Sequence, residues 1–369
     1  MSAGARPGGP HGWPHGWRLA ATLALATAAG ALAQALQIPL PWMIGPLVAT
    51  AAVSLAGLPA TSALALRNAG LWVLGTALGL YFTPAMLALV ARLWPALLLA
   101  LGWALLLGWG FYRWLAFSAR GTGLAPATAF FAGAIGGASE MALLAERHGG
   151  QVDRVAAAHS LRILIVVLLV PFALQALGVH GADPAAKAVR SVDPAGLALL
   201  LAATAAGGAF MQWRRTPNPW VLGALIVSMA ISASGTTLSA VPGGLSNAAQ
   251  LAIGVNLGVR FTPDFVRAAP RWLSAVALGT LVMVALSAGF GALLAWGGGL
   301  HPATMALATS PGGMAEMAIT ASVLGLGAPV VTAFHVLRYV AVLVLTEPLW
   351  RWELRRLAGS TGSTGRTGH

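Results

Sequence analysis

The sequence predicts an all-α polytopic membrane protein with two inverted repeats, about ten transmembrane helices and two re-entrant or broken helices. Three observations carry this prediction: an apolar composition, motifs that occur twice, and two glutamates that follow glycine pairs inside apolar segments. Of the 369 residues, 58% are hydrophobic and 8% are charged, and the mean hydropathy is +0.79. A chain this apolar contains many stretches close to the ~20 residues that cross ~30 Å of hydrocarbon.

The cysteine and charge counts exclude several classes of function. The absence of cysteine excludes disulfides and thiolate chemistry. The net charge of +12 comes from basic residues scattered singly or in pairs, with no basic block or nucleic-acid-reading motif. We therefore expect no direct nucleic-acid partner and assign the charge to cytoplasmic loops, with the lipid bilayer as partner. We also expect no cofactor and no metal site, because the histidines lack ligand spacing.

Four motifs occur once in each half, in the same order and at a nearly constant offset. An ordered set of this kind indicates a duplicated unit. We divide the chain into repeat 1 at 18–178, a polar linker at 179–193 and repeat 2 at 194–357, with disordered tails at 1–17 and 358–369. The motif pairs are LPWMIGPL (40–47) with NPWVLGAL (218–225), LGLYFTP (78–84) with LGVRFTP (257–263), GGASEMA (136–142) with GGMAEMA (312–318), and HSLR (159–162) with HVLR (335–338).

Each repeat contains six apolar elements. The first element of repeat 1 also resembles a signal peptide that ends in ALA at 31–33. Because repeat 2 has a counterpart of this element, we expect it to be a retained helix. The fifth is interrupted by the glycine pair, which leaves pieces of about ten residues, half a membrane span. The expected elements are 18–36, 42–58, 64–82, 93–116, 125–147 and 155–178 in repeat 1, and 194–213, 218–235, 245–261, 271–297, 302–325 and 329–350 in repeat 2.

Loop charge decides whether the fifth element crosses the membrane. If it crosses, giving twelve spans, seven arginines fall on the side opposite the N-terminus, against the positive-inside tendency. If it enters and leaves on one side, ten spans remain, both termini are cytoplasmic, and only Arg92, Lys187 and Arg190 face outward. The arginines then inside are 67, 113, 120, 147, 154, 214, 215, 260, 267, 271, 351, 355 and 356.

Five crossings per repeat invert the second repeat relative to the first. The two re-entrant elements then enter from opposite faces of the membrane. Inverted repeats whose interrupted helices meet near the midplane are typical of secondary transporters.

The candidate site residues are the few ionisable groups inside the apolar segments. Each glutamate precedes its histidine at the same spacing in both repeats, and each arginine follows that histidine by three positions, which places both on one helix face. Since a buried arginine needs a partner, we expect the glutamate of the same repeat to pair with it. The candidate residues for substrate or ion binding are Glu140, His159, Arg162, Glu316, His335 and Arg338.

Structural interpretations stand beside the functional one. The carboxylates could stabilise the start of a half-helix through its dipole. The glycine pairs, Gly136–Gly137 and Gly312–Gly313, could present backbone N–H groups to an anion or could only permit the helix break. The glycine pairs at 75 and 79 and at 254 and 258 are expected to form close helix-packing faces.

The stretches GAIGGASEMALLAERHGGQ, AAHSLRILIVVLLVPF and PGGMAEMAI, with FHVLRYVAVLVL after them, resemble the Gram-negative AbrB membrane family over about 18–355. That family is a duplicated membrane unit, similar in layout to the cation/proton antiporter and anion transporter superfamily. It also carries the labels ammonia monooxygenase and regulation of gene expression. No established catalytic residues carry over from it. No oxygen-activating ligand spacing or dinucleotide fingerprint is visible in the sequence.

We therefore expect a bacterial inner-membrane protein that is not an enzyme and that transports a small solute or ion through a midplane site. The first alternative is a membrane sensor that regulates gene expression through a partner. The second, remote alternative is a membrane monooxygenase. Self-association into a homo-oligomer is left open.

Overall fold

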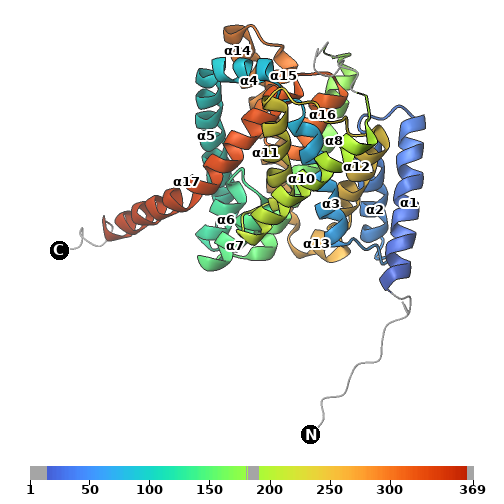
Figure 1. Ribbon diagram of the computed structural model, residues 1–369. Coiled ribbons are helices and arrows are strands. Elements are labelled where there is room, and N and C mark those ends of the chain that lie inside the picture. The colour runs from blue at the N-terminus through green and yellow to red at the C-terminus, as the bar shows by residue number, and fades with distance from the viewer. Residues whose placement is uncertain (1–14, 180, 182–190, 364–369) are drawn as a thin grey trace, which may run out of the picture. The chain divides into compact units, whose positions relative to one another are not determined.

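A computed structural model describes residues 15–179, 181 and 191–363 (Figure 1). Throughout these ranges the regular structure is α-helical, without a strand, as predicted. Several helices are long and apolar enough to cross a bilayer, so this is a multi-pass membrane protein. Most of the tail predicted at 1–17, half of the tail predicted at 358–369 and most of the linker at 179–193 lie outside the described residues. The predicted disorder is wrong for residues 15–17 and 358–363, which are helical.

Each predicted apolar element of repeat 1 corresponds to a helix or a helix pair. The glycine pair separates α6 from α7, as expected for a broken fifth element. The helices are α1 (His15–Ala35), α2 (Pro41–Leu55), α3 (Leu64–Gly79), α4 (Pro84–Arg92), α5 (Trp94–Ser118), α6 (Pro126–Gly133), α7 (Ala138–Arg147) and α8 (Val152–Ala176).

Repeat 2 follows the same order, and its glycine pair separates α15 from α16. The last helix continues past the predicted end of the repeat, through Ser363. The helices are α10 (Pro194–Trp213), α11 (Pro219–Ala233), α12 (Gly243–Gly258), α13 (Pro263–Ala268), α14 (Pro270–Gly298), α15 (Pro302–Thr309), α16 (Met314–Val323) and α17 (Ala328–Ser363).

Two short helices, α4 and α13, were not predicted. Both follow the repeated FTP motif, whose threonine side chain accepts a backbone hydrogen bond: Thr83 from Met86 and Thr262 from Phe265. Threonine before a proline at the first helical position is a helix-start signal. The duplicated FTP motif was therefore a signal from which both short helices could have been predicted.

Six of the ten predicted spans have the length and apolarity to cross a membrane: α1, α5, α8, α10, α14 and α17. The broken pair α3 and α4 makes a seventh if it counts as one span. The other helices expected to span, α2, α11 and α12, have 15 or 16 residues, and at 1.5 Å per residue they are shorter than ~30 Å of hydrocarbon. The number ten therefore stays a prediction.

The chain forms two compact units that do not follow the repeat boundary. Unit 1 contains Met1–Ala77, Ser191–Ser228 and Leu238–Ala268, and unit 2 contains Leu78–Arg190, Met229–Thr237 and Ala269–His369. Unit 1 thus takes most of the first three elements of each repeat, although the last residues of α3 and α11 belong to unit 2. Unit 2 takes the last three elements of each repeat, including both broken helices.

Within unit 1, the two repeats make reciprocal contacts through glycines. An added Cβ at Gly75 would collide with the Val221 backbone, and one at Gly254 would collide with the Met43 backbone. Each glycine has its counterpart in the other repeat, and so does each partner, at nearly the same offset. Repeat 1 thus packs on repeat 2 as repeat 2 packs on repeat 1. The predicted close-packing role is confirmed at Gly75, Gly254 and Gly258, where an added Cβ would collide with Thr50.

Alanine at Gly75 or at Gly254 should lower the free energy of unfolding by about 1–3 kcal/mol, because the added methyl group overpacks a helix contact. Gly102→Ala is the matched control, since a Cβ there meets nothing within 4 Å. Thermal unfolding of the purified variants in detergent measures the difference. Unchanged midpoints for G75A and G254A would contradict the packing role.

Candidate functional site

Unit 2 contains two interrupted helix pairs of the same construction. The first break, residues 134–137, joins α6 to α7, and the second, residues 310–313, joins α15 to α16. Ala134 and Ser310 end the preceding helices with extended backbone, at ψ 137° and 147°. Carbonyl groups at a helix end have no partner within the helix. In an apolar surrounding they need donors from elsewhere.

The donors at the first break come from α8. The His159 ring Nε2 lies 3.0 Å from the Phe131 carbonyl oxygen, and Arg162 Nη1 donates to the Ala134 carbonyl at 3.1 Å. A carbonyl oxygen only accepts, so Nε2 carries the proton, and the bare Nδ1 accepts from Arg162 Nη2 at 2.9 Å. Both side chains are buried. His159 and Arg162 therefore hold the end of α6 as one hydrogen-bonded group.

At the second break α17 supplies the same residue types at the same spacing. His335 Nε2 lies 2.9 Å from the Leu307 carbonyl, and Arg338 Nη1 donates to the Ser310 carbonyl. The sequence separation is 28 residues in all four contacts. Arg338 adds a bond that Arg162 lacks, from Nη2 to the Gly312 carbonyl at 2.6 Å. The second break is thus held at two carbonyls by one arginine.

The expected pair between Glu140 and Arg162 is wrong. Arg162 donates to the break and to His159, while Glu140 Oε1 lies 3.4 Å from the Tyr339 hydroxyl. The physical reason is local: a helix C-terminus carries partial negative charge on its carbonyls and supplies the acceptors the guanidinium needs. The sequence identifies the glutamate side chain as a possible partner, but it does not show that the Ala134 carbonyl at the helix end lies within reach of Arg162.

Both glutamates occupy the first turn of the half-helix after the break, as the helix-dipole interpretation predicts. Glu140 is the third residue of α7 and Glu316 the third of α16. Acidic side chains at this position interact favourably with the helix N-terminus. Glu316 is buried, and Glu140 is partly buried.

The glycine pairs provide space rather than an unusual backbone conformation. Gly137 and Gly313 have ordinary φ angles of −69° and −72°. A Cβ at either would collide with Oε2 of the glutamate that follows in the next helical turn, so glycine allows the carboxylate to fold back over the helix start. An alanine there would displace the carboxylate.

The two breaks share α8 and α17 in a reciprocal arrangement. Arg162 of α8 bonds the first break, against which Val342 of α17 packs at Gly136; a Cβ there would lie 3.2 Å from Val342. Arg338 of α17 bonds the second break, against which Val166 of α8 packs. The two valines are separated by the same offset as the two arginines. The structure thus places two positively charged guanidinium groups at two breaks that pack on the same pair of helices, where like charges repel.

Several buried polar atoms at the breaks have no hydrogen-bond partner among the described residues. They are the Nε atoms of Arg162 and Arg338, Oε2 of Glu140 and Nδ1 of His335. A buried group without a partner costs about 1–3 kcal/mol, so a cluster of them indicates a place for water, an ion or a solute. The cavity beside Arg338 is about 10 Å³, room for about one water.

A family model matches most of the chain. The model described as "Transition state regulatory protein AbrB" matches residues 42–353, which include both breaks and all six candidate residues. This chain belongs to the AbrB family.

This AbrB-family protein is similar to two bacterial proteins. It is 26% identical over 324 residues to "Putative regulator AbrB" of Escherichia coli (strain K12), covering 85% of this chain and 90% of that protein. It is 25% identical over 241 residues to "Uncharacterized protein YhjN" of Bacillus subtilis (strain 168), covering 61% of this chain and 62% of that protein. The chain thus spans about three fifths of the Bacillus relative's length.

Sequence reasoning missed two polar groups of the AbrB-family chain. Tyr339 follows the HVLR motif directly, but its repeat counterpart is Ile163, so the duplication gave no signal. Glu353 is buried and accepts a hydrogen bond from Tyr112 at 2.9 Å. Its position among arginines 351, 355 and 356 made it look like part of a solvated charged segment.

Proposed function

We propose that this AbrB-family protein is a secondary transporter of a small solute or ion, and not an enzyme, in the bacterial inner membrane. The reciprocal pair of broken helices, held by buried arginines and surrounded by unpartnered polar atoms, carries the proposal. Interrupted backbone inside a membrane is tolerated where it is buried in protein or lines a cavity. Transporters place substrate and coupling ions at such half-helix ends.

The six candidate residues divide into two roles in this proposal. Glu140 and Glu316 bind the coupling ion or a proton, because a carboxylate is the acidic group available there. Arg162 and Arg338 act as counter-charges or anion anchors through the Nε–H groups that the breaks leave unused. The histidines keep the arginines in place.

The proposal includes a topology in which both termini are cytoplasmic and the two broken helices enter from opposite faces. Within unit 2, α6 and α7 lie at the lower end in Figure 1, whereas α15 lies at the upper end. This separation supports opposite entry.

Single cysteines test the topology, because the natural chain has none. Arg120 and Glu146 flank the first broken pair, and Gly297 and Val323 flank the second; all four positions are exposed. An impermeant thiol reagent added outside intact cells should label G297C and V323C and leave R120C and E146C unlabelled until the membrane is opened. Labelling of only one member of either pair would contradict re-entry and restore the twelve-span layout.

The transport activity itself is tested in proteoliposomes with trapped proton-sensitive dye, using gradients of Na⁺, K⁺, phosphate and sulfate. A thermal-shift screen of metabolites and ions on the purified protein selects further solutes, because a ligand of the folded state raises its apparent stability. Transport by the protein alone is the expected result.

A second candidate function is a membrane sensor that regulates gene expression through a partner protein. The family description and the name of the Escherichia coli relative, both of which call the protein a regulator, favour it. A sensor would bind a solute in the thermal-shift screen without moving it across the proteoliposome membrane.

A further inference from the structure

A second cavity in unit 2 lies between α5, α6 and α17, apart from the six candidate residues. Its volume is about 310 Å³, within the range of small-molecule sites. Its walls are almost entirely apolar, and Ala134 and Ile135 of the first break form part of them. Leu106 and Leu349, on its rim, are 57% and 39% exposed, so the cavity opens on an apolar face.

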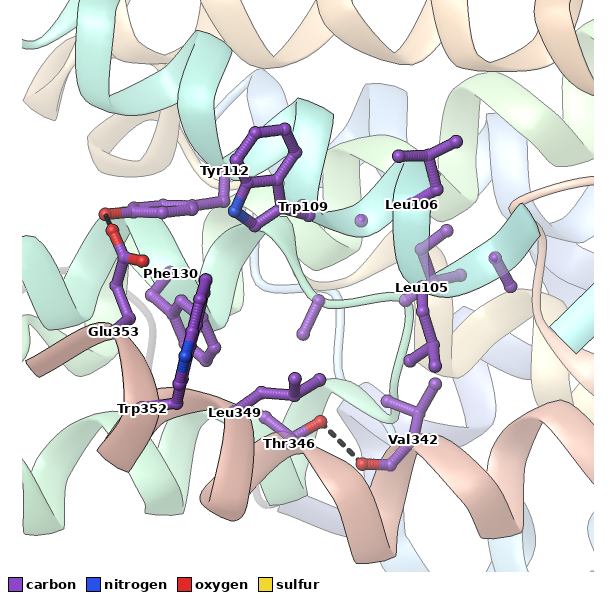
Figure 2. A pocket seen from close by; sticks show the side chains of 14 residues that line it. Leu105, Leu106, Trp109, Tyr112, Phe130, Val342, Thr346, Leu349, Trp352 and Glu353 are labelled. Carbon is purple, nitrogen blue, oxygen red and sulfur yellow. Dashed lines mark hydrogen bonds between the residues drawn. The ribbon is translucent and has the colours of Figure 1, made fainter. Parts of the chain in front are cut away.

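One end of the cavity is polar. The Tyr112 hydroxyl donates to Glu353 Oε1 at 2.9 Å, and Figure 2 shows these two groups beside Phe130 and Trp352. Glu353 Oε2 lies 3.7 Å from Arg356 Nη1. Its charge is therefore already opposed by Arg356, and the carboxylate leaves little attraction for a cationic ligand.

Two arginines stand at this end, each over a tryptophan that lines the cavity. The Arg113 guanidinium carbon is 5.8 Å from the Trp109 ring centre, and that of Arg356 is 5.9 Å from the Trp352 ring centre. Both arginines are exposed, and Glu353 offsets only one of the two charges. The polar end thus keeps net positive charge next to an apolar cavity.

We propose that this cavity binds an anionic phospholipid, with an acyl chain between α5 and α17 and the phosphate at Arg113 and Arg356. Apolar walls that open on a lipid-facing surface match the chain, and paired arginines with tryptophans match a head group at the membrane interface. The bound chain contacts Ala134, whose carbonyl Arg162 holds, so the lipid supports the first break. The inference is independent of the proposed transport.

Native mass spectrometry of the detergent-purified protein tests the proposal with dioleoyl-phosphatidylglycerol, dioleoyl-phosphatidylcholine and sn-glycerol 1-phosphate as probes. The wild type should retain phosphatidylglycerol in preference to phosphatidylcholine, and glycerol phosphate should not compete, because it lacks the chain. Equal retention of the two lipids would overturn the proposal. Displacement of phosphatidylglycerol by glycerol phosphate would also overturn it.

Gly108→Met fills the cavity from α5. A Cβ at Gly108 has its nearest neighbour at 3.4 Å, an ordinary contact, and Gly110→Met on the same helix is the matched control, with nothing within 4 Å. G108M should lose retention of both lipids while G110M keeps it. Ala104→Met provides a second filling variant should G108M not purify as a folded protein. Wild-type lipid retention in a folded filling variant would place the lipid elsewhere and overturn the proposal.

The double variant R113A/R356A should weaken phosphatidylglycerol retention by about fivefold per arginine while leaving phosphatidylcholine unchanged. Arg120→Ala is its control, since Arg120 is an exposed arginine of the same region over Phe117, a ring outside the cavity. An equal loss in R120A would show general surface attraction instead of a site and would overturn the head-group assignment.

Discussion

Replacing Arg338 with methionine should destabilise the protein more than the same change at Arg162. Arg338 donates to two break carbonyls, Ser310 and Gly312, whereas Arg162 donates to one, Ala134. Each buried carbonyl left without a donor costs about 1–3 kcal/mol. R162M also removes the donor to His159 Nδ1, but the corresponding atom in repeat 2, His335 Nδ1, has no hydrogen-bond partner among the described residues. R338M should therefore lose more stability than R162M, by about the 1–3 kcal/mol of the extra carbonyl, measured by thermal or denaturant unfolding in detergent.

The two arginines also repel each other, so their losses should not add. The double variant R162M/R338M should be less stable than the sum of the single losses predicts, because each single removal already relieves the same repulsion, which the double removal relieves only once. Arg120→Met, at an exposed position, controls for loss of an arginine as such. Equal stability of R162M and R338M would show that the second carbonyl bond contributes nothing.

Changing both glutamates to glutamine should abolish the pH dependence of transport and weaken binding of the coupling ion roughly tenfold to a hundredfold, since bonds to charged groups contribute about 1.5–3 kcal/mol. Glutamine at the third position of α7 and α16 still suits a helix start, so the variant should fold. Loss of activity is then separated from loss of structure.

The control for this variant is Glu146→Gln, which removes an exposed carboxylate from the other end of α7. The measurements are thermal unfolding and proton-dye fluorescence in proteoliposomes. A folded E140Q/E316Q protein with wild-type transport and pH response would make both carboxylates structural and would move the proposed site elsewhere.

The sequence predicted the helix breaks and singled out the histidines and arginines beside them, because three independent signals coincide there. Gly136–Gly137 and Gly312–Gly313 interrupt long apolar runs, the ionisable groups are rare, and both patterns recur at one common offset between the repeats. The same duplication predicted that the helix order would repeat, as it does from α1 to α17.

The hydrogen-bond acceptors of these histidines and arginines could not be predicted. They are backbone carbonyl groups, which every residue has, so the sequence does not show which of them lack a partner. Glutamate was the visible choice for Arg162, yet the helix end at Ala134 lies within reach and Glu140 turns back over its own helix start. The Tyr112–Glu353 pair was also invisible, since its members are 241 residues apart and have no counterpart in the repeat pattern.

The division into units that cut across the repeats has a consequence for biogenesis. The chain passes between the units at five places, and each unit needs segments from both repeats. While the ribosome has made only repeat 1, Arg162 can already bond the first break, but Gly136 still lacks Val342, which is synthesised only near the end of repeat 2. After insertion, repeat 1 therefore contains only its own part of each of the two units until repeat 2 has been synthesised. Before the duplication, a single-repeat ancestor would have completed both units only by pairing with a second copy of itself.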